Sequence, residues 1–270
     1  MAQQSNKNFA IPLAFVGLMF FTLGFALGIN SFLIPVLKES LNLSSGVAYL
    51  LLAATFIPFI IFGYPASRTI AAIGYKRTMA ISFVIFALAF VVFVLSAKNE
   101  SFILFLAASF VSGTANAYLQ ASVNPYITIL GPIDSAARRI SMMGICNKLA
   151  WPVAPLFFAA VVPDSTNVQI ADLYLPFYII IGVFVLLSII SLMAPLPEVK
   201  ATGEDESSAD DCPYAASKTS IWQFPHLLLG VLALFVYVGV ETLALSTAID
   251  YATAVGLPSP DRYAWIPSIG

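Results

Sequence analysis

The chain has 270 residues, of which 60% are hydrophobic and only 10% are charged, and its mean hydropathy is +0.91. This composition is typical of helical integral membrane proteins and argues against a soluble globular domain. The net charge of −2 points to no nucleic-acid partner, and the two cysteines, Cys146 and Cys212, give neither a disulfide framework nor metal-ligand spacing.

The first apolar run extends from Phe9 to about Pro35. It is too long for the core of a signal peptide and lacks a small-residue cleavage site, so we expect a retained first transmembrane helix. Gly24 and Gly28 have the spacing at which glycines let helices pack closely, and we favour this packing role over a gating role. Asn30 and Ser31 form the polar end of the run.

Two further spans are expected, from about Ser44 to Pro65 and from about Thr78 to Ser96. The fourth run, Ser101 to Pro132, is also long enough to cross a bilayer, but its second half carries polar side chains at every fourth position: Asn116, Gln120, Asn124 and Thr128. A step of four residues advances only about 40° around a helix, so these side chains share one stripe.

Amides that face lipid are costly, so the stripe is expected to face protein or a water-filled cavity. Pro125 adds a second signal, because it has no N–H to donate to the carbonyl of Ala121 and leaves a polar acceptor inside the membrane. The fourth run therefore predicts a helix that lines a path for a polar, uncharged solute.

A fifth helix is expected from about Ile140 to Val162 and a sixth from about Leu173 to Pro195. Lys148 lies within the fifth, where it could pair with an intramembrane acid or extend its amine to the membrane surface. Asn147 beside it could bind a solute or hold two helices together.

Residues 196–220 are acidic, small and interrupted by proline, which predicts a loop that links two parts of the chain. A seventh span follows from Ile221 to about Ile249. It contains Glu241, with Tyr237 one turn earlier on the same face. An intramembrane carboxylate indicates a cation or proton site, and the alternative is a structural carboxylate paired with another helix. His226 at the start of this span is expected to be an interfacial residue.

The basic residues predict the orientation of the chain. If the N-terminus is cytoplasmic, the inner loops hold eight basic residues and the outer loops hold three. The inner ones are Lys7, Arg68, Lys76, Arg77, Arg138, Arg139, Lys200 and Lys218, and the outer ones are Lys38, Lys98 and Arg262. The N-terminus is therefore predicted to be cytoplasmic.

Aromatic side chains in the polar helices could stack on the apolar face of a ring-shaped solute: Tyr118, Tyr126, Trp151 and Tyr237. The sequence contains no GxSxG, HExxH or phosphate-binding glycine loop, so we expect a protein that is not an enzyme.

Several segments are similar to one family. INSFLIP, LQASVNPYITILGPIDSAARRISMMGICNK and WQFPHLLLGVLALFVYVGVE resemble the fucose permease-like branch of the major facilitator superfamily, especially its bacterial glucose, galactose and N-acetylglucosamine transporters. The loop GYPASRTIAAIGYKR looks like a degraded form of the superfamily's Gly-Asp-Arg-Gly-Arg loop, with Ser67 in place of the acid.

The resemblance implies an all-α fold of two six-helix bundles around a central cavity. On this basis, 1–195 is the N-terminal transmembrane bundle, 196–220 a cytoplasmic linker, and 221–270 the first helix of the C-terminal bundle with an outer loop. Relative to that pattern, the chain is expected to be truncated.

The positions of the two coupling acids of the fucose permease correspond here to Ser31 and Gln120, neither of which titrates, while Asn147 matches a cavity asparagine. We therefore expect hexose transport across a bacterial inner membrane by a monomer without a cofactor, coupled to H⁺ or Na⁺. The expected sugar contacts are Asn30, Gln120, Asn124, Asn147, Tyr118 and Tyr237, and the expected coupling residues are Glu241 and Lys148. The alternatives are an uncoupled facilitator and a non-transporting sensor or remnant.

Overall fold

The computed structural model describes residues 10–131, 133–162, 168–194, 196 and 220–255. The chain divides into two compact units, Met1–Val199 and Lys200–Gly270, and each is described by itself. The predicted linker at 196–220 lies outside the described residues except at its two ends, as does the end of the predicted outer loop, residues 256–270.

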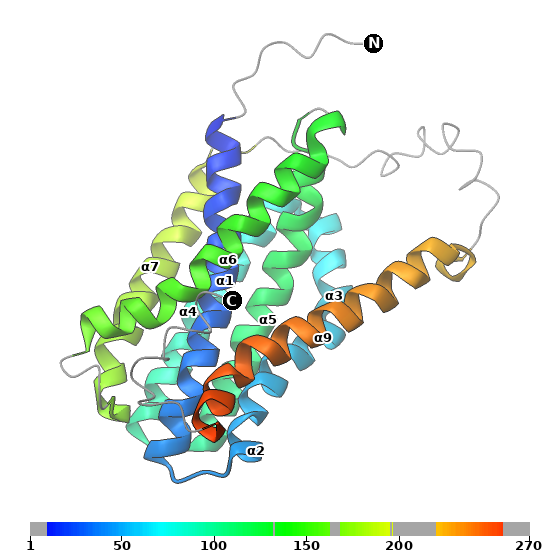
Figure 1. Cartoon of the computed structure of the whole chain (residues 1–270). Helices are drawn as coiled ribbons and strands as arrows, with labels where there is room; N and C mark the ends of the chain where they lie inside the picture. Colours follow the sequence, from blue (N-terminus) through cyan, green and yellow to red (C-terminus); the bar gives the residue numbers. More distant parts are fainter. Residues whose placement is uncertain (1–9, 132, 163–167, 195, 197–219, 256–270) are drawn as a thin grey trace, which may run out of the picture. The chain divides into compact units, whose positions relative to one another are not determined.

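Six long helices make up the described part of the first unit (Figure 1). Their bounds are α1 (Ala10–Ser40), α3 (Leu50–Ile73), α4 (Tyr75–Lys98), α5 (Phe102–Ile129), α6 (Ala136–Val161) and α7 (Tyr174–Met193). Short elements connect them: α2 (Ser45–Ala48) and the 3₁₀ turns η1 (Ile133–Ser135) and η2 (Ile170–Leu173). In the second unit, the turn η4 (Ile221–Gln223) precedes α9 (Pro225–Ala254).

Seven of the described helices are long and apolar enough to cross a membrane: the six long helices of the first unit and α9. Helices satisfy their own backbone hydrogen bonds, which is the requirement that hydrocarbon imposes on a spanning segment. The predicted all-α, multi-pass fold is therefore confirmed.

The predicted end of the second span is wrong. We expected it near Pro65, but α3 continues to Ile73 and ends at Gly74, where φ is +84°. A proline removes one helical hydrogen bond, yet an apolar segment gains more by remaining helical than by exposing its backbone. One turn after Pro65, the Thr69 hydroxyl donates to the Pro65 carbonyl at 2.9 Å.

Aromatic rings fill the contact between α4 and α7. The Phe86 and Phe184 rings stack at 4.8 Å, and Phe90 and Phe93 of α4 lie 5.7 and 5.5 Å from Phe177. All five side chains are almost fully buried. α4 therefore buries its aromatic side chains against α7, and α5 packs against α4 as well.

Two helix pairs approach so closely that only glycine fits at the contact. A Cβ atom at Gly24 of α1 would lie 2.0 Å from the carbonyl oxygen of Asn147 in α6. One at Gly113 of α5 would lie 2.1 Å from the carbonyl oxygen of Thr55 in α3, and one at Gly28 would lie 2.9 Å from Ala154. The predicted packing role of Gly24 and Gly28 is confirmed, and Gly113 plays the same part in the second pair.

Candidate functional site

The polar stripe of α5 runs from the protein interior to the surface. Asn116 is fully buried, Gln120 is half-buried and Asn124, one further turn along, is exposed. Thr128 is half-buried, and its hydroxyl donates to the Pro125 carbonyl at 2.6 Å. Gln120 and Asn124 are thus the members of the stripe whose amides reach the surface of the first unit.

At the buried end of the stripe, the Asn116 amide lacks hydrogen bonds that would offset its loss of contact with water. Neither its Nδ2 nor its Oδ1 atom has a hydrogen-bond partner among the described residues, and the same holds for the hydroxyl of Ser112, one turn earlier. A buried polar group without a partner costs about 1–3 kcal/mol. Asn116 therefore lowers the stability of this conformation.

Asn30 joins α1 to α5. Its side chain is 1% exposed, its Nδ2 donates to the Ala26 carbonyl at 3.2 Å, and its Oδ1 accepts a hydrogen bond from the Ser109 hydroxyl at 3.2 Å. Both ends of the amide are thus engaged inside the bundle. Asn30 can reach a sugar only if this contact between α1 and α5 opens.

Asn147 lies where α6 touches α1. It is half-buried, and its Nδ2 donates to the Phe20 carbonyl at 3.1 Å. This bond supports the interpretation of Asn147 as a residue that holds two helices together, and it leaves the side-chain oxygen as the atom that could accept a hydrogen bond from a solute.

Lys148 lies near the middle of α6, about 18 Å along the helix axis from Ala136. Its side chain is exposed, and Nζ lies 5.8 Å from the ring centroid of Trp151. The amine therefore contacts the face of an indole instead of extending to the start of the helix. The Trp151 N–H and the Ser31 hydroxyl are buried and lack a hydrogen-bond partner in the described part of the chain.

The aromatic candidates have different surroundings. Tyr118 is half-buried, and its ring lies 6.3 Å from that of Phe62 in α3. Tyr126 is 1% exposed and packs against Tyr75 at 5.8 Å, so it belongs to the core and is not placed to stack on a solute.

In the second unit, Tyr237 and Glu241 interact as the four-residue spacing predicts. The Tyr237 hydroxyl donates to Oε1 of Glu241 at 3.4 Å, and Glu241 is half-buried. His226, at the first turn of α9, is exposed. Tyr237 and Glu241 therefore form one hydrogen-bonded pair on the same face of α9.

Arg139 is a structural residue that we counted only as a loop charge. It is 7% exposed, its Nε and Nη2 donate to the carbonyls of Ile127 and Thr128 at 3.1 and 3.0 Å, and its Nη1 donates to the hydroxyl of Ser135. The last carbonyls of a helix have no partner within the helix. Arg139 therefore caps the end of α5 that carries Asn124.

No group of three or more histidine, cysteine, aspartate or glutamate side chains that could hold a metal ion occurs in the described residues. The polar groups on the stripe are amides and hydroxyls, which donate and accept hydrogen bonds without carrying charge. This arrangement is suited to binding hydroxyl groups of a neutral solute.

A family profile described as Major Facilitator Superfamily matches residues 16–269. The chain is 32% identical over 265 residues to the glucose/galactose transporter of Brucella abortus, covering 95% of this chain and 63% of that protein. It is 23% identical to the L-fucose-proton symporter of Escherichia coli, covering 92% of this chain and 60% of the symporter. The chain thus spans less than two thirds of the length of these relatives.

The fold also matches a solved structure. The crystal structure of the transporter FucP in the outward conformation aligns with a TM-score of 0.71 and 23% identity, over 90% of this chain and 63% of that one. At this identity the match concerns the fold alone.

Proposed function

Because the chain belongs to the Major Facilitator Superfamily, we propose that it acts in the transport of a hexose-type sugar by alternating access. The observation that carries the proposal is the stripe of α5, where the uncharged amides of Gln120 and Asn124 become accessible one turn apart. The glucose/galactose transporters and L-fucose-proton symporters among the relatives support a sugar as the substrate.

Gln120 and Asn124 are the first proposed sugar contacts, since each amide offers two donors and an acceptor to sugar hydroxyls. Tyr118 is the proposed stacking residue on the same helix, and Tyr237 a further one in the second unit. Asn147 contributes through its oxygen, and Asn30 only in a conformation that breaks its bond to Ser109.

Cation-coupled symport is the fuller form of the proposal. Ser31 and Gln120 cannot titrate, so a proton cannot be carried at those two positions. Glu241, with Tyr237 donating to it, is the proposed site for H⁺ or Na⁺, and Lys148 is a second intramembrane charge. Uncoupled facilitation is the second candidate, favoured by the absence of a titratable group at Ser31 and Gln120.

The proposed location is the bacterial inner membrane with the N-terminus in the cytoplasm. The loops predicted to lie on the same side of the membrane as the N-terminus contain most of the lysine and arginine residues, which supports this orientation.

The test is uptake of labelled glucose, galactose, fucose and N-acetylglucosamine by cells that express the full-length protein. Gln120→Ala should reduce uptake of the transported sugar about tenfold or more, because about 1.4 kcal/mol of lost hydrogen bonding corresponds to a factor of ten. Thr114→Ala is the matched control, since Thr114 is also half-buried on α5 but its hydroxyl bonds to Phe110 of its own helix. Normal uptake by Gln120→Ala at equal membrane abundance would remove Gln120 from the site.

A further inference from the structure

α1 and α7 each present an apolar stripe to the other helix, but the side chains of the two stripes do not pack against each other along their whole length. The α1 stripe consists of side chains three or four residues apart, including Phe15, Leu18 and Phe25, and the α7 stripe includes Val183 and Ile190. Helix pairs normally bury such stripes against each other. Here Leu18, Val183 and Ile190 remain 42%, 47% and 38% exposed. We call the space between the two stripes the α1–α7 seam.

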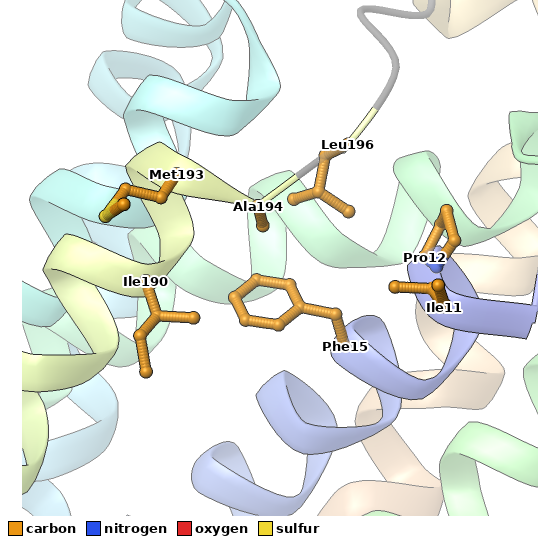
Figure 2. A pocket seen from close by; sticks show the side chains of 7 residues that line it. All are labelled: Ile11, Pro12, Phe15, Ile190, Met193, Ala194 and Leu196. Atoms are coloured by element: carbon orange, nitrogen blue, oxygen red, sulfur yellow. The ribbon is translucent and has the colours of Figure 1, made fainter.

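The seam contains two cavities in succession. The first, of about 370 Å³, lies between the N-terminal end of α1 and the C-terminal end of α7. Figure 2 shows Phe15 of α1 pointing across it toward Ile190 of α7, with Ala194 beside the ring. The second, of about 220 Å³, lies further along the same two helices and is also bordered by Phe157 of α6.

The lining excludes a polar occupant. Thr22 is the one side chain with a polar group among those that line the two cavities, and its hydroxyl donates to the Leu18 carbonyl of its own helix at 2.9 Å. No side-chain hydrogen-bond donor in this lining is therefore left for a ligand. The α5 stripe proposed for sugar uses other residues, so the seam is independent of that proposal.

The dimensions fit a flexible hydrocarbon chain. From Ile11 to Phe25 the seam follows α1 for about 21 Å, and one leaflet of a bilayer has a hydrocarbon thickness of about 15 Å. A helix of another protein, about 10 Å across, is too wide to enter cavities of this size, whereas a chain of methylene groups is not. The seam also opens onto a lipid-compatible surface, since Leu186, Ile189 and Leu192 of α7 are all more than half exposed.

We propose that the α1–α7 seam binds one acyl chain of a membrane phospholipid from the leaflet that surrounds the N-terminal end of α1. The bound chain fills both cavities and completes the packing between the two helices. Its head group lies at the membrane surface near Pro12 and Leu196, where the seam begins.

Native mass spectrometry of the full chain in mild detergent, with added palmitoyl-oleoyl phosphatidylethanolamine, tests the proposal. We expect one retained lipid per chain. Val183→Trp, which places a large side chain in the second cavity, should lower the lipid-bound fraction at least about fivefold. The matched control is Leu186→Trp, on the same helix and 55% exposed but outside the cavity lining, which should retain the lipid.

Three outcomes would overturn the proposal: no lipid on the unsubstituted chain, equal retention by the two tryptophan variants, or a two-chain species that Val183→Trp dissociates, which would make the seam a protein interface. If Val183→Trp does not fold, Ala194→Leu, which narrows the first cavity, must lower the bound fraction for the proposal to stand.

Discussion

Asn116 and Asn30 are both buried asparagines on facing helices, but they have opposite effects on stability. Asn30 is hydrogen-bonded at both ends of its amide, whereas Asn116 has no partner for either amide atom among the described residues. Asn30 therefore stabilises the contact between α1 and α5, whereas Asn116 buries an amide without hydrogen bonds and destabilises α5 in its surroundings.

This contrast predicts opposite results for the same substitution. Asn116→Leu should raise the melting temperature in detergent by several degrees, because it removes two unpaired polar atoms worth about 1–3 kcal/mol each. Asn30→Leu is the control and should lower it, since the Ser109 hydroxyl then loses its partner. A fall in melting temperature for Asn116→Leu would show that its amide is paired after all.

Glu241 is the residue on which coupling depends in the proposed function. Glu241→Gln keeps the size and hydrogen-bonding capacity of the side chain but removes its charge. Accumulation of sugar against a gradient should be lost, while exchange of labelled for unlabelled sugar across vesicle membranes should persist. Normal accumulation by this variant would exclude Glu241 from coupling, and loss of both activities would indicate a structural carboxylate.

At the scale of the helix, the end of α5 depends on a side chain from α6. The final turn of α5 leaves backbone carbonyls that need donors, and the buried guanidinium of Arg139 supplies them to Ile127 and Thr128. At Gly131, φ is +107°, which lets the chain turn back toward Arg139.

Arg139→Ala should therefore destabilise the protein by about 2–4 kcal/mol, because it leaves two carbonyls without their charged donor. Arg138→Ala is the matched control, since Arg138 is the exposed neighbour with the same charge, and it should be nearly neutral. Thermal unfolding in detergent measures both. Equal melting temperatures for the two variants would mean that water replaces the guanidinium without cost.

At the scale of the whole molecule, orientation can be tested independently of transport. In a background with Cys146→Ser and Cys212→Ser, Glu100→Cys and Asp134→Cys place single thiols in two exposed turns at opposite ends of α5. A cytoplasmic N-terminus predicts that a membrane-impermeant maleimide labels only Glu100→Cys in intact spheroplasts. The reverse labelling pattern would invert the topology.

The sequence alone predicts the transmembrane helices well, because hydropathy over about 20 residues is a local property. The predicted end of the second span at Pro65 is wrong. A proline usually ends a helix in water, but in an apolar setting the remaining backbone hydrogen bonds keep the segment helical, and the sequence around one proline does not distinguish the two cases. The partners of the polar residues could not be predicted: Ser109 is 79 positions from Asn30, and nothing in the local spacing joins them. The capping role of Arg139 could have been predicted, because this basic residue follows shortly after the end of α5, where backbone carbonyls lack partners within the helix.

The backbone contacts at Gly24 and Gly113 imply how the first unit can deform. Between α1 and α6, and between α3 and α5, no side chain stands at these points that could change its rotamer and absorb sliding. Each pair should consequently move as a rigid body. A rearrangement of the bundle would then tilt the α1–α6 pair relative to the α3–α5 pair and strain the Asn30–Ser109 hydrogen bond between them, while the two helices within each pair would not slide past each other.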